Sequence, residues 1–181
     1  MTVVLALPGG FAPVGSVIDV GTGAGFPGLP LKLAFPHLRL ALVESVGKKA
    51  EFLRHVVSTL GLSGVGVHTG RAELLAHEPE LRETFDVAAT RALAGLSVLA
   101  EYTLPFCRDG GVMAALKHGG IEAELAGATH SVEVLGGRIE TVHPVEVTGL
   151  TDNRIVVVVD KISSTPNRYP RRPGIPSKRP L

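Results

Sequence analysis

The sequence predicts an α/β fold, a doubly wound and mostly parallel Rossmann-like sheet that an antiparallel hairpin completes at its C-terminal end. Three observations lead to this prediction: strand-like and helix-like segments alternate, a glycine-rich turn follows the first strand, and the last two strand-like segments have no helix between them. The 181 residues are 45% hydrophobic, which suffices for one core. We expect one domain over residues 1–161 and a basic, proline-rich tail over 162–181.

Each expected element follows from its apolar spacing. In the segment Val46–Leu60, for example, apolar residues recur every three or four positions and Gly61 ends the helix. The expected parallel strands are Val17–Val20, Leu38–Val43, Val65–His68, Phe85–Thr90 and Val112–Lys117. The expected helices are Leu29–Phe35, Val46–Leu60, a short one from Ala72, Leu96–Phe106 and Ile121–Leu135. The closing hairpin consists of Ile139–Val147 and Ile155–Lys161.

Composition excludes several classes of protein. The chain has no apolar run of about 18 residues and no basic region before its short apolar N-terminus, so we expect neither a membrane span nor a secretory signal. The single cysteine, Cys107, excludes a disulfide within the chain, and we interpret it as a buried structural residue in the middle of a helix. The seven histidines lack metal-ligand spacing. We therefore expect a cytoplasmic protein without a metal.

Charge is distributed unevenly along the chain. Residues 161–181 hold six cations and no acid, for a net charge of +6, whereas residues 1–160 hold 12 basic and 17 acidic groups, for −5. A slightly acidic body with a basic tail is typical of proteins that contact a polyanion. The alternative is a solvated tail that aids solubility. The pattern PNRYPRRPGIPSKRP favours extended or polyproline structure over helix in this tail.

The glycine-rich turn carries the first functional signal. Gly23, Gly25 and Gly28 match a dinucleotide-binding pattern, but Asp19 lies two residues before Gly21, and a carboxylate there disfavours a pyrophosphate. S-adenosylmethionine has no phosphate and carries a cationic sulfonium and an ammonium group, so an acid at this position suits it better. The alternative role for Asp19 is to hold the loop backbone.

Two further acids follow the next two strands. Glu44 ends the second strand, where nucleotide-binding sheets place an acid for ribose hydroxyls. Ala72 and Glu73 open the helix after the third strand, where a backbone amide and a carboxylate could hold an adenine edge. The alternatives are a helix cap for Glu44 and a first-turn acid favoured by the helix dipole for Glu73. Together the three acids favour S-adenosylmethionine.

Cations follow the fourth and fifth strands. Arg91 and Lys117 stand at these two strand ends and suit an RNA phosphate, although each alone could be an ordinary surface charge. Phe26 could pack on the cofactor, on the target base, or in the core of the glycine turn. No Asn/Asp-Pro-Pro-aromatic segment follows the fourth strand, and the residue immediately before Cys107 is not a proline. These absences disfavour methylation of adenine amines and of cytosine C5.

Six segments carry a resemblance to a known family: DVGTGAGFPGLPLK, VESVGKKAEFL, GRAE, TRALAGLSVLAE, ALKHGG and TPNRYPRRPGIPSKRPL. The sequence resembles the bacterial 16S ribosomal RNA guanine-N7 methyltransferases, also called the glucose-inhibited division protein B family. The resemblance implies a class I methyltransferase sheet and in-line methylation of one guanine near the decoding region of the small subunit. It also implies cofactor contacts by Gly21, Phe26, Glu44, Ala72, Glu73 and Arg91, with Gly23 and Gly25 as loop glycines.

For catalysis, no general base is expected, because guanine N7 already presents a lone pair, and Arg91 and Lys117 would position the RNA. The expected RNA-binding residues are Lys117, Arg168, Arg171, Arg172, Lys178 and Arg179. Family members share a mostly helical segment ahead of the glycine strand, and MTVVLALPGG resembles its end. The alternatives are a nicotinamide-dependent oxidoreductase, a non-catalytic ribosome-assembly factor and a small-molecule methyltransferase.

Overall fold

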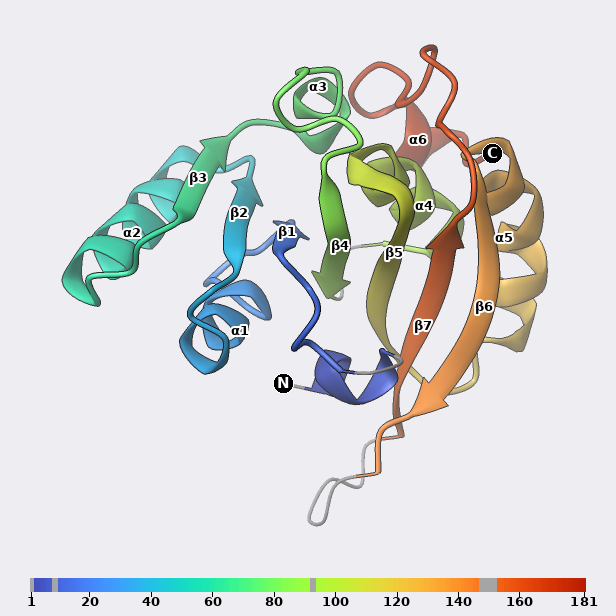
Figure 1. The fold of residues 1–181 in the computed structure, drawn as a ribbon. Coiled ribbons are helices and arrows are strands. Elements are labelled where there is room, and N and C mark those ends of the chain that lie inside the picture. The colour runs from blue at the N-terminus through green and yellow to red at the C-terminus, as the bar shows by residue number, and fades with distance from the viewer. Residues whose placement is uncertain (1, 8–9, 92–93, 147–152) are drawn as a thin grey trace.

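A seven-stranded sheet organises the computed structural model, which describes residues 2–7, 10–91, 94–146 and 153–181 (Figure 1). The strand order is β3-β2-β1-β4-β5-β7-β6. The strands from β1 to β5 pair in parallel, whereas β7 runs antiparallel to both β5 and β6. The bounds are β1 Ser16–Val20, β2 Arg39–Glu44, β3 Val65–Thr69, β4 Phe85–Arg91, β5 Cys107–His118, β6 Gly137–Pro144 and β7 Arg154–Lys161. The predicted doubly wound sheet with its closing hairpin is confirmed; Val147 lies outside the described residues.

Helices cover both sides of the sheet. In Figure 1, α1 and α2 lie beside β1, β2 and β3, whereas α4 lies by β5 and α5 by β6. The α-helices are α1 Gly28–Ala34, α2 Gly47–Thr59, α3 Ala72–Leu75, α4 Leu96–Thr103, α5 Glu122–Val134 and α6 Ile175–Lys178. Two 3-10 helices, η1 at Thr2–Ala6 and η2 at Leu104–Phe106, complete the described elements.

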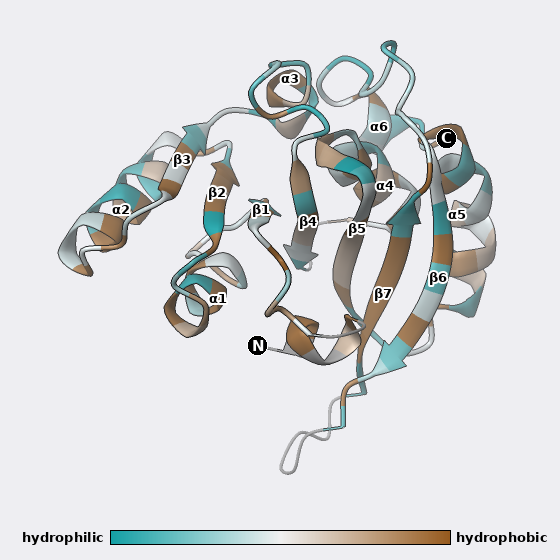
Figure 2. Ribbon diagram, viewed as in Figure 1, coloured by the Kyte–Doolittle hydropathy of each residue, from teal (hydrophilic) through white to brown (hydrophobic). Residues whose placement is uncertain are grey.

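The core consists of two apolar layers, one on each face of the sheet. Because successive side chains of a strand point to opposite faces, Val156 and Val158 of β7 pack in the layer with η1 and α1, and Val157 and Val159 pack with α4 and α5. The apolar strands stand out in Figure 2, and more hydrophilic loops surround α3 and α6. This framework fixes the strand ends, where polar residues gather.

The prediction of one helix over Leu96–Phe106 is wrong in its last turn. Helix α4 ends at Thr103, and Pro105 lies in the 3-10 helix η2 that follows. Cys107 is consequently the first residue of β5 and not a mid-helix residue. It is fully buried, and burial raises the pKa of its thiol to about 12, so the expected buried cysteine is confirmed in a different element.

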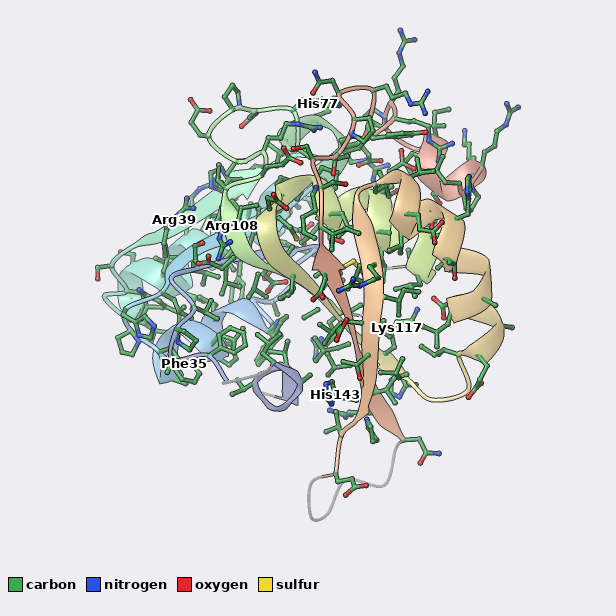
Figure 3. All side chains as sticks on the ribbon, turned by 45° about the vertical axis from the view of Figure 1, so that its right-hand side comes forward. Phe35, Arg39, His77, Arg108, Lys117 and His143 are labelled. Carbon is green, nitrogen blue, oxygen red and sulfur yellow. The ribbon has the colours of Figure 1, made fainter. Side chains whose placement is uncertain are left out.

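The C-terminal tail also differs from the prediction that favoured extended or polyproline structure over helix, because residues 175–178 form the short helix α6. The tail is docked on the body by buried or half-buried polar contacts. Arg82 donates to the Thr165 and Tyr169 carbonyls at 2.8 and 3.0 Å, and His77 contacts the Pro170 carbonyl at 2.9 Å. Figure 3 shows His77 beside this segment. Partners from distant parts of the chain thus shape the tail, and sequence spacing alone does not reveal them.

Candidate active site

Asp19 holds the glycine loop that connects β1 to α1. Its Oδ2 atom accepts hydrogen bonds from the Thr22 hydroxyl at 2.7 Å and the Gly28 N–H at 2.8 Å. A side chain at position 28 would come within 3.0 Å of this carboxylate oxygen and within 2.7 Å of Leu42, so glycine fits best there. Asp19 therefore fixes the loop, which is one of the two roles expected from the sequence.

The other carboxylate oxygen of Asp19, Oδ1, differs from Oδ2 in its hydrogen bonding. Oδ1 is buried and has no hydrogen-bond partner among the residues that the structure describes. Burial raises the pKa of this carboxyl group to about 6, although Thr22, Gly28 and Arg91 act in the opposite direction. A buried carboxylate with one unsatisfied oxygen is costly, and a cationic ligand nearby would offset part of that cost. This site therefore fits a cofactor that carries positive charge.

The backbone of the glycine loop offers few free donors for a phosphate. The Gly21 and Thr22 N–H groups donate to the Val43 carbonyl at 3.0 and 3.2 Å. The Gly25 and Phe26 N–H groups donate to the Thr22 carbonyl at 2.9 and 3.2 Å. Since pyrophosphate sites depend on free N–H groups at this turn and on the opening of the following helix, this loop disfavours a dinucleotide.

Beside the loop lies a hollow of about 260 Å³. It brings together five of the residues predicted for the cofactor, namely Gly21, Gly23, Glu44, Ala72 and Glu73. The two Glu44 oxygens accept separate hydrogen bonds, Oε2 from the Gly23 N–H at 3.1 Å and Oε1 from the Val46 N–H at 2.8 Å. Glu44 thus ties the glycine loop to the start of α2, and its carboxylate oxygens keep further lone pairs for other donors.

Glu73 has partners that the sequence did not indicate. Its Oε1 accepts the Gly174 N–H of the tail at 3.0 Å, and its carboxylate also bonds the hydroxyl of Tyr102 from α4. Burial and then the negative charge of Glu73 raise the pKa of that hydroxyl. The carboxylate therefore connects the hollow to the tail, and Tyr102 lines the hollow with it.

Phe26 and Arg91 lie next to each other at the end of the glycine loop. The Phe26 side chain is 47% exposed, so it is not a core residue of the turn. The Arg91 guanidinium lies 5.4 Å from the centre of its ring, which is a cation–π distance. Gly25, with φ of +97°, aims the chain toward this position. Asp19, Gly25, Phe26 and Arg91 do not line the 260 Å³ hollow itself.

A second and larger cavity, of about 480 Å³, has Arg91 in its wall. Its other polar lining residues are Lys117, His118, Glu124 and Arg154, and its apolar ones are Leu116, Ile121 and Ile155. Lys117 is 14% exposed, and its Nζ atom pairs with Glu124 Oε1 at 2.7 Å and donates to the Ala94 carbonyl at 3.0 Å. The cation predicted at the end of β5 is therefore anchored at the cavity wall.

The predicted RNA-binding residues of the tail differ in exposure. Arg168, Arg172, Lys178 and Arg179 are exposed. Arg171, in contrast, forms a bidentate pair with Glu101 of α4, with distances of 2.9 Å from Nε to Oε1 and 2.6 Å from Nη2 to Oε2. Glu101 is 1% exposed, so Arg171 attaches the tail to the body. The tail and the cavity are apart, since Figure 3 shows Lys117 well away from His77.

Sequence reasoning missed several residues at these two sites. Tyr102 and Glu124 lie in helices without a motif, and Arg154 begins a strand that is next to β5 only in the folded sheet. The predicted hairpin offered one signal for Arg154: if its second strand pairs antiparallel to the fifth strand, the start of that strand lies opposite His118, as the pairing of His118 with Arg154 shows. Among the described residues, no group of acids, histidines or cysteine has the geometry of a metal site, and no helix could cross a membrane.

Known proteins with similar sequences identify the family. Residues 4–153 match the model of the family described as rRNA small subunit methyltransferase G. The protein of that name from Roseiflexus sp. (strain RS-1) is 51% identical over 176 residues, which cover 97% of this chain and 74% of the relative. The chain belongs to this family. The relative of the same name from Moorella thermoacetica is 49% identical, with 93% of this chain and 70% of the relative covered.

Solved structures agree on the fold. A geranyl diphosphate methyltransferase with bound S-adenosylmethionine matches with a TM-score of 0.61 at 13% identity, covering 84% of this chain and 81% of that one. The mitomycin 7-O-methyltransferase matches with a TM-score of 0.66 at 16% identity, covering 88% and 52%. The chain therefore belongs to a methyltransferase family and has a class I methyltransferase fold.

Proposed function

We propose that this chain transfers a methyl group from S-adenosylmethionine to N7 of one guanine in the decoding region of 16S ribosomal RNA. The observation that supports it best is that two hollows lie at the strand ends and differ in their charged lining residues. Two acids, Glu44 and Glu73, line the hollow beside the glycine loop together with Lys49 and Arg71, whereas cations predominate in the other. Arg91 of the second hollow lies over the ring of Phe26 in the glycine loop. The buried Asp19 carboxylate beneath the glycine loop suits a cationic cofactor, and a polyanionic substrate suits the second hollow.

In this proposal the cofactor hollow works through its backbone and its acids. Glu44 takes the ribose hydroxyls, since both of its oxygens are fixed by backbone N–H groups. Ala72 and Glu73 meet the adenine edge, and Gly21, Gly23 and Gly25 let the loop pass close to the methionine part. Asp19 beneath the loop favours the positive charge of that part.

The chemistry asks little of the protein beyond positioning. S-adenosylmethionine, when bound, supplies a methyl group on a cationic sulfur. Guanine N7 carries a lone pair and no proton, so no residue has to remove a proton from it. The chain's residues need only bind and orient the reacting groups and exclude water from them. Phe26 offers an exposed aromatic face for a base taken out of its stack. Arg91 and Lys117 then hold the RNA on the other side.

We assign RNA phosphate contacts also to the exposed cations of the tail. Arg168, Arg172, Lys178 and Arg179 present their charges to solvent, and Arg171 keeps the segment attached through Glu101. In this proposal, residues 1–161 form the methyltransferase domain and residues 162–181 form a docked basic tail. With small-subunit rRNA as its substrate, we assign the activity to the cytoplasm.

The decisive experiment uses methyl-labelled S-adenosylmethionine with small ribosomal subunits, and separately with naked 16S rRNA, both lacking the modification. After nuclease digestion, we expect the label in a single N7-methylguanosine, whose position is then mapped. Label in another nucleoside would contradict the assigned acceptor. Cofactor binding without any transfer would favour the non-catalytic assembly factor.

A further inference from the structure

The 480 Å³ cavity raises a question of base selection, on the premise that the proposed function holds. Guanine and adenine both present N7 as an acceptor, so a methyltransferase cannot select guanine by N7 alone. The two bases differ in their other edges, where guanine carries N–H donors at N1 and N2. A pocket that selects guanine therefore needs an acceptor for these donors, and a carboxylate is the strongest one available.

The cavity holds one carboxylate among its described lining residues, Glu124 of α5. The remaining polar lining residues, Arg91, Lys117, His118 and Arg154, include three permanent cations that suit O6 of guanine and RNA phosphates. The volume of about 480 Å³ lies within the range of about 300–1,000 Å³ that is usual for small-molecule sites. Charge and size thus match a nucleotide whose base needs one acceptor.

Glu124 is held in a fixed position with one oxygen left over. Its Oε1 accepts the Leu96 N–H at 2.5 Å and the Lys117 ammonium at 2.7 Å. Its Oε2 accepts no hydrogen bond from any residue in the described part of the chain. The side chain retains 28% of its exposure, so it is accessible from the cavity that it lines. Two anchors on one oxygen preorganise the other for a ligand.

We infer that Glu124 is a specificity-determining residue that accepts hydrogen bonds from the N1–H and N2–H₂ groups of the target guanine in this cavity. Adenine presents a bare N1 acceptor at the equivalent edge, which the carboxylate repels. Lys117 fixes the carboxylate and does not replace it as an acceptor, since an ammonium group can only donate.

The test removes a donor from the base and, separately, the carboxylate acceptor from the protein. The target guanine found in the labelling experiment is replaced by inosine, which keeps N7, O6 and N1–H but lacks the N2 amino group. Transfer is measured as kcat/KM for wild type and for Glu124→Gln, whose amide oxygen can still accept from Leu96. Because a hydrogen bond to a charged group is worth roughly 10- to 150-fold, we expect wild type to prefer guanine over inosine at least about 10-fold. In Glu124→Gln this preference falls to near one.

Two further variants and two control measurements complete the test. Glu122→Gln, on the exposed side of the same helix, should keep the wild-type preference. Lys117→Met removes the ion pair but leaves the carboxylate, so it should transfer more slowly with the guanine preference intact. Cofactor affinity and thermal unfolding, measured on every variant, monitor the fold.

Two results would overturn the inference. An equal loss by Glu124→Gln on guanine and on inosine would show that Glu124 acts only through Leu96 and Lys117. Failure of wild type to label guanine N7 at all would instead overturn the proposed function, and the inference with it.

Discussion

The two hollows at the ends of the strands are built in different ways. The cofactor hollow takes most of its residues from the ends of β1, β2 and β3 and the short segments that follow them, and its charged lining residues are two acids and two cations. The 480 Å³ cavity, which we propose holds the methyl acceptor and here call the acceptor cavity, combines the ends of β4 and β5, the first turn of α5 and the start of β7. Its charged lining residues are mainly positive. The comparison shows that a cofactor site can be encoded in local motifs, whereas the acceptor site depends on the order of strands in the sheet.

The contrast predicts which substitutions affect one function and spare the other. Cofactor binding should depend on the acids, and RNA binding on the cations. Arg91 is the exception, because it lines the acceptor cavity and lies over Phe26 of the glycine loop.

The largest expected effect concerns Asp19, whose buried charge makes the cofactor site costly to fold. Because its pKa rises from 3.8 to about 6 on folding, the unfolded chain loses this proton first as the pH increases. The free energy of unfolding therefore falls between about pH 4 and pH 6, and the penalty stays constant above, at about 3 kcal/mol. Asp19→Asn removes this penalty, so at pH 8 it should be more stable than wild type while binding S-adenosylmethionine more weakly.

Urea unfolding at pH 4 and at pH 8 checks this expectation for both proteins. The stability difference between the variant and wild type should grow in favour of the variant from pH 4 to pH 8. A constant difference would mean that Asp19 is not the source of the pH dependence.

The second effect tests how the tail is attached to the cofactor side. Arg171→Ala leaves Glu101 buried without its partner, and we expect a loss of between about 2 and 3 kcal/mol because the arginine is partly exposed. Arg172→Ala, at the next and exposed position, should change stability by less than about 0.5 kcal/mol. Urea unfolding of both variants measures the difference, and equal effects would contradict a structural role for Arg171.

The third effect separates the two hollows directly. Glu44→Gln should weaken S-adenosylmethionine binding by roughly 10-fold or more, since hydrogen bonds to a charged acceptor lose strength when the charge is removed. Affinity for unmodified 16S rRNA should stay within about two-fold, a margin well below one hydrogen bond. Isothermal titration calorimetry and filter binding measure the two affinities. Glu51→Gln, exposed on α2, is the control. A matching loss of RNA affinity would contradict the assignment of Glu44 to the cofactor hollow alone.

The smallest effect concerns the acceptor cavity. Arg154→Gln should weaken RNA binding a few-fold and reduce the slope of log affinity against log salt by about one, with cofactor affinity unchanged. Arg138→Gln, at the other end of the same hairpin, provides the control. An unchanged slope in Arg154→Gln, or a weaker cofactor affinity, would place Arg154 outside the RNA contacts.

The sequence was enough to predict the sheet, the glycine loop and the acids at three strand ends, because hydrophobic periodicity and glycine spacing are local properties of the chain. It could not show that α4 ends at Thr103, that Glu73 bonds the Gly174 N–H, or that Arg171 pairs with Glu101. Those contacts join residues 70 or more positions apart or depend on packing at one turn. The 480 Å³ cavity likewise forms only in the folded sheet, because antiparallel pairing with β5 brings Arg154 to the wall where α5 places Glu124.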